Sequence, residues 1–142
     1  MRKDLVLYIH GKGGSAAERE HYAPLFPDCE VVGLDYKTFT PWETGREIRE
    51  AVEPLYRAGR SITLIANSIG AYLRYVRSHP VSWNVPTEIL YGSADELTAY
   101  ETIAAFAAAH RAGLTVMDGG EHWFHTPEQM AFLDAWIQGR QG

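Results

Sequence analysis

The stretch from residue 61 to residue 72 constrains the fold of this chain more than any other. An apolar, β-branched run ends at Ala66, Ser68 follows it, and a helical pattern begins immediately with Gly70 in its first turn. Small residues on both sides of the serine permit a turn so tight that the backbones of strand and helix nearly touch. Such a turn exposes the serine hydroxyl at the carboxyl edge of a sheet, beside the free N–H groups of the new helix. The pattern therefore predicts a nucleophile elbow of the G-x-S-x-G type, with alanine in the first glycine position.

The composition is that of an ordinary globular protein. With 142 residues, 46% hydrophobic and 22% charged, the chain suits a single domain over residues 1–142. The net charge is −5 and no basic run is present, which argues against nucleic acid as a partner. Cys29 is the only cysteine, so no internal disulfide can form, and the apolar run 5–9 is too short for a secretion signal or a membrane span. We expect a soluble cytoplasmic protein that binds neither nucleic acid nor membrane.

Apolar runs alternate with helical patterns along the whole chain, which predicts an α/β fold with a mostly parallel sheet. The expected strands span residues 5–9, 30–35, 61–66, 87–91 and 114–117. Capping boxes, in which a Thr or Ser is followed three residues later by Glu or Gln, predict helix starts at Ser15, Thr40, Thr98 and Thr126. Ser68 lacks such a partner, since Ala71 holds that position, but an ordinary helix cap remains the alternative interpretation of this serine.

A serine hydroxyl becomes a useful nucleophile only when a base takes its proton and a third group orients that base. Asp95 follows the strand expected at 87–91, and His122 follows the strand expected at 114–117. Because the carboxyl ends of parallel strands meet at one edge of a sheet, both turns are expected beside Ser68. His125 in the same loop is the alternative base, and Glu96 is a less favoured alternative to Asp95.

The glycine-rich segment after the first strand supplies backbone donors for a negatively charged transition state. Its glycines, Gly11 among them, let N–H groups approach a ligand closely, and we expect the amides of Lys12 and Ile69 to form an oxyanion hole. Gly11 and Trp123 are the expected substrate-binding residues. Aromatic side chains near the strand ends, Trp123 among them, predict an acyl-binding surface or a dimer contact.

Taken together, these motifs resemble the α/β-hydrolase superfamily over nearly the whole chain. Residues 7–11 are similar to its oxyanion loop, 66–70 to its elbow, 90–95 to its acid turn and 120–124 to its histidine loop. The resemblance implies that Ser68 is the nucleophile, Asp95 the orienting acid and His122 the general base of a serine hydrolase that requires no cofactor. It implies cleavage of small carboxylic esters through an acyl-enzyme.

The spacing departs from that family between Ser68 and the acid strand. Only one helix and a short linker fit there, so one central strand–helix unit and the cap domain are expected to be absent. The remaining five strands predict a doubly wound, three-layer sheet in the order 2-1-3-4-5. A homodimer is also expected, and the alternative to a closed sheet is a gap filled by a second chain through swapping or edge pairing.

Three other functions remain open. The loop at residues 11–15 resembles a phosphate-binding turn, although it matches neither the P-loop nor the dinucleotide fingerprint, so a flavodoxin-like phosphate or flavin binder is one alternative. A hydrolase fold that has lost catalysis is another. A metal site at Glu121, His122 and His125 lacks a further well-spaced ligand, and no metal is expected.

Overall fold

The computed structural model describes residues 4–38, 40–67 and 85–141. The chain divides into two compact units, Met1–Ile69 and Gly70–Gly142. A single domain over residues 1–142 stays a prediction.

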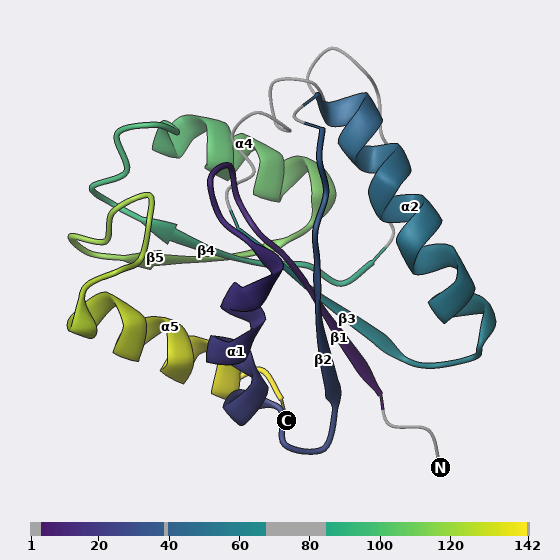
Figure 1. Cartoon of the computed structure of the whole chain (residues 1–142). Helices are drawn as coiled ribbons and strands as arrows, with labels where there is room; N and C mark the ends of the chain where they lie inside the picture. The colour runs from purple at the N-terminus through teal and green to yellow at the C-terminus, as the bar shows by residue number, and fades with distance from the viewer. Residues whose placement is uncertain (1–3, 39, 68–84, 142) are drawn as a thin grey trace. The chain divides into compact units, whose positions relative to one another are not determined.

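The first unit is built on a three-stranded parallel sheet. Strand β1 (Leu5–Ile9) lies between β2 (Glu30–Leu34) and β3 (Ile62–Ala66), as Figure 1 shows. Leu7 of β1 is paired with Val32 on one side and with Leu64 on the other. This order agrees with the first three positions of the expected sheet.

The central strand forms the core of the first unit. Leu5, Val6, Leu7 and Tyr8 are each no more than 1% exposed, so consecutive residues are buried on both faces of the strand. Unbroken apolar runs of this kind are typical of parallel sheets with helices on both sides. Each buried aliphatic side chain contributes roughly 1.5–3 kcal/mol to stability. This rigid strand carries the glycine-rich loop at its carboxyl end.

The helices of the first unit begin where the capping boxes predict. Ser15 precedes the short 3₁₀ helix η1 (Ala16–Glu18), and its backbone N–H donates to the Glu18 carboxylate at 3.1 Å. Helix α1 (Arg19–Tyr22) and a second 3₁₀ turn, η2 (Ala23–Leu25), follow directly. Thr40 caps α2 (Pro41–Arg57), with its hydroxyl donating to Glu43. In Figure 1, α1 and α2 lie on either side of the three strands.

The second unit contains a parallel strand pair with one helix on each side. Strands β4 (Glu88–Gly92) and β5 (Gly113–Met117) pair in register from end to end. The ribbons of α4 (Tyr100–His110) and α5 (Pro127–Gln138) run on either side of them in Figure 1. A β3–β4 pairing would join the two units, so the order 2-1-3-4-5 across the whole chain stays a prediction. None of the helices described here is long and apolar enough to cross a membrane.

The expected strand bounds agree with the structure to within one residue, but one helix start is wrong. The N-cap of α4 is Ala99 rather than Thr98. Thr98 is buried, its N–H donates to the Asp95 carboxylate at 2.9 Å, and its carbonyl oxygen accepts the Tyr91 hydroxyl at 2.7 Å. Thr98 is therefore part of the turn after β4, and the helix begins after that turn is complete.

Candidate active site

The turn that carries Asp95 is fastened to the loop that carries His122 by backbone hydrogen bonds. The N–H of Ser93 donates to the carbonyl oxygen of Met117 at 2.9 Å, and the N–H of Ala94 donates to that of Gly120 at 2.8 Å. The ladder between β4 and β5 thus continues beyond both strands. These backbone bonds alone hold the two turns at a fixed separation.

The carboxylate of Asp95 accepts hydrogen bonds on both oxygens. Oδ1 accepts from the N–H groups of Leu97 at 2.8 Å and Thr98 at 2.9 Å, and Oδ2 lies 2.7 Å from Nδ1 of His122. The side chain of Asp95 is only 6% exposed. Two backbone donors fix the plane of the carboxylate, so its second oxygen is aimed at the imidazole.

The hydrogen bond to Asp95 determines which nitrogen of His122 can act as a base. A carboxylate only accepts, so Nδ1 of His122 carries the hydrogen and Nε2 of the neutral ring keeps its lone pair. The imidazole is about one-fifth exposed. The structure thus brings His122 and Asp95 into the contact that an orienting acid and its base require. Their catalytic roles, and that of Ser68, stay predictions.

His125, the alternative base, is bound to its own loop. Its Nδ1 lies 2.7 Å from the carbonyl oxygen of Trp123 and 3.3 Å from Oε2 of Glu121, and its ring stacks on the Trp123 indole with centroids 5.0 Å apart. These contacts orient His125 toward residues of the same loop. The geometry favours His122 over His125 as the base.

The buried side chain of Gln129 forms hydrogen bonds with two residues of the loop that contains His122. Its Oε1 accepts from the N–H of His125 at 3.1 Å, and its Nε2 donates to the carboxylate of Glu121 at 3.3 Å. Its backbone N–H donates to the hydroxyl of Thr126, the N-cap of α5, at 3.2 Å. The capping box at Thr126 predicts only a capping function for Gln129. The same capping pattern is the signal in the sequence that this residue faces the loop.

In the first unit, the glycine-rich segment forms a tight turn directly after β1. The N–H of Gly14 donates to the carbonyl oxygen of Gly11 at 3.1 Å, and Gly13 has a φ of 85°, in the left-handed region that favours glycine. Lys12, one of the two expected oxyanion donors, lies inside this turn. Gly11 lies at the start of the turn, and its contact with a substrate stays a prediction.

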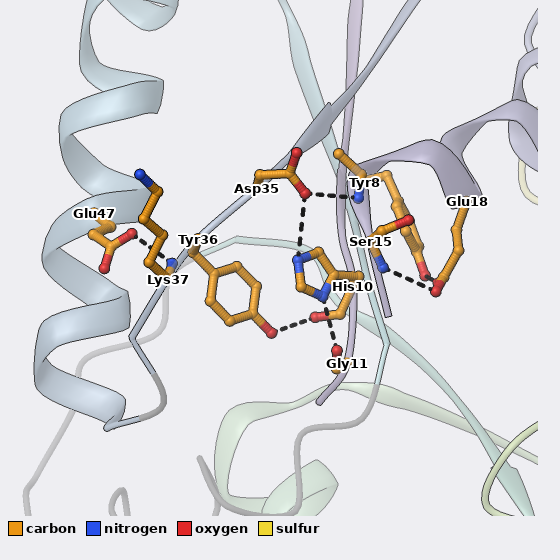
Figure 2. A network of polar contacts seen from close by, with 10 residues as sticks. Tyr8, His10, Gly11, Ser15, Glu18, Asp35, Tyr36, Lys37 and Glu47 are labelled. Atoms are coloured by element: carbon orange, nitrogen blue, oxygen red, sulfur yellow. Dashed lines mark hydrogen bonds and ion pairs between the residues drawn. The ribbon is translucent and has the colours of Figure 1, made fainter. Parts of the chain in front are cut away.

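The imidazole of His10 is packed beneath the turn. It is 6% exposed and stacks on the ring of Tyr36, with centroids 4.4 Å apart and planes 6° from parallel. Its Nδ1 lies 2.8 Å from the carbonyl oxygen of Gly11, and the Tyr36 hydroxyl donates to the carbonyl oxygen of His10 at 2.5 Å (Figure 2). Burial raises the pKa of Tyr36, and the negative charge of Glu18 adds to the effect. Tyr36 is a site residue that the sequence motifs do not include, and its position just past the carboxyl end of β2 is the signal that could have indicated it.

Asp35 directly follows β2, and its side chain contacts the start of η1. Its Oδ1 accepts from the N–H of Ala16 at 2.9 Å and lies 3.9 Å from Nε2 of His10 (Figure 2). Beside it, the hydroxyl of Tyr8 donates to the carboxylate of Glu18. The glycine turn is therefore framed by polar contacts from β1, β2 and η1.

Two of the expected site residues, Ser68 and Ile69, lie outside the described residues. The strand that leads to them is described up to Asn67, whose N–H donates to the carbonyl oxygen of Ile9 at 3.0 Å. The carboxyl ends of β1 and β3 therefore lie side by side at one edge of their sheet. In the part of the chain that the structure covers, no group of three or more His, Cys, Asp or Glu side chains could hold a metal ion.

No protein-family model matches this sequence, and comparison with curated proteins finds no match. Solved structures do resemble it. An α/β serine hydrolase homologue from Coxiella burnetii has a TM-score of 0.68 at 15% identity, covering 100% of this chain and 87% of its own. An α/β serine hydrolase without a lid from Xanthomonas campestris has a TM-score of 0.68 at 13% identity, covering 98% and 81%. The RedJ thioesterase of Streptomyces coelicolor has a TM-score of 0.69 at 12% identity, covering 94% and 84%. The resemblance to the α/β-hydrolase superfamily is thus confirmed as a likeness of fold.

Proposed function

We propose that this chain is a serine hydrolase that cleaves small carboxylic esters through an acyl-enzyme, with Ser68 as nucleophile, His122 as general base and Asp95 as orienting acid. The observation that carries the proposal is the 2.7 Å hydrogen bond between Nδ1 of His122 and the buried carboxylate of Asp95. It leaves Nε2 of His122 as the basic nitrogen of the neutral ring, which is the state that proton abstraction from a serine requires. The likeness to solved α/β serine hydrolases supports the same reaction class.

In the first half of the reaction, Nε2 of His122 takes the proton of the Ser68 hydroxyl while the serine oxygen attacks the ester carbonyl. The resulting oxyanion accepts hydrogen bonds from the amides of Lys12 and Ile69. Removal of one such donor typically costs about 3 kcal/mol of transition-state stabilisation. As the tetrahedral intermediate collapses, the imidazolium returns its proton to the leaving oxygen, and the alcohol departs from the acyl-enzyme.

The second half repeats these steps with water. Neutral His122 takes a proton from a water molecule, the hydroxide oxygen attacks the acyl carbonyl, and the imidazolium then protonates the serine oxygen as the carboxylic acid leaves. Asp95 is not protonated at any step. Its contribution is to hold the imidazole in one tautomer and one orientation, and to stabilise the imidazolium when it forms.

The surface near the acid and the base is suited to an apolar part of the substrate. Leu97, two residues after Asp95, is 77% exposed, and Trp123, next to His122, is 67% exposed. Large apolar side chains exposed beside a reactive pair are suited to contact an apolar substrate group. One of the solved structures that resemble this chain is described as lidless, which fits the expected absence of a cap here.

Labelling with a fluorophosphonate probe, followed by peptide mapping, tests the nucleophile. We expect one adduct on Ser68 in the wild-type protein and none in Ser68→Ala. If folded wild-type protein takes no adduct at Ser68, the serine hydrolase assignment is wrong. Thermal stabilisation by phosphate, or visible absorbance from a bound flavin, would then support the alternative binding function.

The base is tested separately with short-chain p-nitrophenyl esters. We expect His122→Ala to abolish turnover and His125→Ala to retain most of it, because His125 is bound to its own loop. The reverse result would assign the base to His125. Adduct formation on Ser68 without turnover in the wild-type protein would identify a hydrolase fold that has lost efficient catalysis.

A further inference from the structure

The carbonyl groups of His10 and Gly11 precede the N–H of Lys12, and each accepts a hydrogen bond from a side chain, as Figure 2 shows. The carbonyl oxygen of His10 accepts the hydroxyl of Tyr36 at 2.5 Å. The carbonyl oxygen of Gly11 accepts from Nδ1 of His10 at 2.8 Å and from the N–H of Gly14 at 3.1 Å. Neither carbonyl can turn without breaking at least one of these bonds.

The orientation of these carbonyl groups determines where the next N–H groups point. A peptide group is planar and trans, so the N–H of one residue points opposite to the carbonyl oxygen of the residue before it. The Gly11 carbonyl points inward, toward the His10 imidazole, and the N–H of Lys12 is therefore directed away from that ring. The Tyr36 hydroxyl sets the preceding plane in the same way.

The imidazole that makes this contact is itself held in place. It is buried, stacked on Tyr36, and its Nε2 has no hydrogen-bond partner among the described residues. Since a carbonyl oxygen only accepts, the hydrogen of the neutral ring resides on Nδ1. Glycine at position 11 provides no side chain to restrict the backbone, so the orientation of this segment depends on these outside contacts.

We propose that Tyr36 and His10 are positioning residues that orient the Lys12 N–H as an oxyanion donor. This inference rests on the proposed hydrolase function for its catalytic consequence. Tyr36 lies just past the end of β2 and His10 just past the end of β1. The orientation of the Lys12 N–H therefore depends on residues that follow two neighbouring strands of one sheet. Neither side chain needs to touch the substrate to act in this way.

Kinetics of three variants and one control variant test the proposal in the whole 142-residue chain. Tyr36→Phe keeps the stacked ring and removes the hydroxyl, so we expect kcat to fall by about 10- to 100-fold with KM nearly unchanged. His10→Asn keeps a donor close to the position of Nδ1, whereas His10→Leu has a similar volume and no donor. We expect His10→Asn to retain markedly more kcat than His10→Leu. Tyr56→Phe, which alters an exposed tyrosine of α2, should leave kcat unchanged.

A second readout does not depend on activity. In ¹H–¹⁵N spectra we expect Tyr36→Phe and His10→Leu to shift the Lys12 amide resonance and to speed the solvent exchange of the Gly14 N–H, which donates to the Gly11 carbonyl oxygen, and His10→Asn to do so less. An unchanged Lys12 resonance together with unchanged Gly14 exchange in both Tyr36→Phe and His10→Leu overturns the proposal, whether or not the protein is a hydrolase. Altered exchange with unchanged kcat in an active enzyme overturns the catalytic consequence. An inactive wild-type protein with altered exchange instead identifies failure of the proposed function and leaves the positioning supported.

Discussion

Gly92 and Gly120 lie so close together that Gly92 has no room for a side chain and Gly120 has very little. A Cβ atom on Gly92 would lie 2.2 Å from the carbonyl oxygen of Gly120, and one on Gly120 would lie 3.0 Å from the Cα atom of Gly92. Gly92 ends β4 and precedes the Asp95 turn, while Gly120 precedes His122. This backbone contact is what allows two side chains 27 positions apart in sequence to form a hydrogen bond.

The contact predicts that Gly92→Ala separates the acid from the base. The new methyl group would meet backbone rather than a flexible side chain, so the loop at Gly120 must move. We expect a stability loss of about 1–3 kcal/mol in urea unfolding, typical of overpacking. We expect kcat to fall by about 100-fold, because a displacement near 1 Å in a catalytic group has that effect.

Gly139→Ala is the matched control, since its nearest contact would be an ordinary 3.4 Å to the carbonyl oxygen of Ala135. It should change neither kcat nor stability by a comparable amount. Equal effects in the two variants would show that the close approach of Gly92 and Gly120 is not what holds the pair together.

Asp95→Asn tests the tautomer of His122. The asparagine oxygen can still accept from Leu97 and Thr98, but the group facing His122 becomes an amide that donates to Nδ1. The hydrogen of the ring then moves to Nε2, which can no longer accept a proton. We expect kcat for a short-chain ester to fall on the order of 10³- to 10⁴-fold with little change in stability. Glu96→Gln, at the adjacent exposed acid, should retain activity, and the opposite ranking would assign the orienting acid to Glu96.

Much of this arrangement could be predicted from sequence because it follows from mainly apolar runs. Each strand is such a run ended by turn-forming residues, and Asp95 and His122 each follow one. Parallel strands bring their carboxyl ends to one edge, so the meeting of these two residues follows from topology alone. No knowledge of side-chain packing is needed for that step.

The features that were missed depend on choices between competing contacts. The capping pattern at Thr98 was present, but the Asp95 carboxylate takes the N–H of Thr98 and delays the helix by one residue. The contact between Tyr36 and the His10 carbonyl spans 26 positions and depends on how far past β2 the chain turns. Gln129 could be assigned to a cap, but not to the buried position from which it joins Glu121 to His125. Periodicity and spacing place these residues along the chain, but they do not determine which of the competing contacts each residue makes.

The position of Gln129 predicts a pH-dependent effect of Gln129→Glu. The new carboxylate can accept from the N–H of His125 but cannot donate to Glu121, and two like charges then lie about where Nε2 and Oε2 now lie, 3.3 Å apart. We expect a stability loss of about 1–3 kcal/mol at pH 7, because a buried polar group loses its partner. The loss should be smaller at pH 4, where a protonated carboxyl can again donate.

Urea unfolding of the wild type and the variant at both pH values measures this difference. Gln138→Glu, at the exposed end of α5, introduces the same charge away from the loop and should change stability by only a few tenths of a kcal/mol up to about 1 kcal/mol. A stability loss in Gln129→Glu that is the same at pH 4 and pH 7 would rule out repulsion between the two carboxylates as its cause.

Tyr8 predicts a loss of stability at alkaline pH. Burial raises the pKa of its hydroxyl above the ordinary value of 10.0, and the hydrogen bond to Glu18 raises it further. Because the folded-state pKa is above the unfolded value, the contribution is complete below pH 10 and is lost as the pH rises beyond it. Above pH 10 the free energy of unfolding falls by at most about 1.4 kcal/mol per pH unit on account of this group. Tyr8→Phe removes both this titration and the hydrogen bond to Glu18. Because of the lost hydrogen bond, the wild type should be the more stable protein by about 1–2 kcal/mol at pH 7. Its advantage should shrink between pH 10 and pH 11 in urea unfolding, and parallel pH profiles for the two proteins would contradict the assignment.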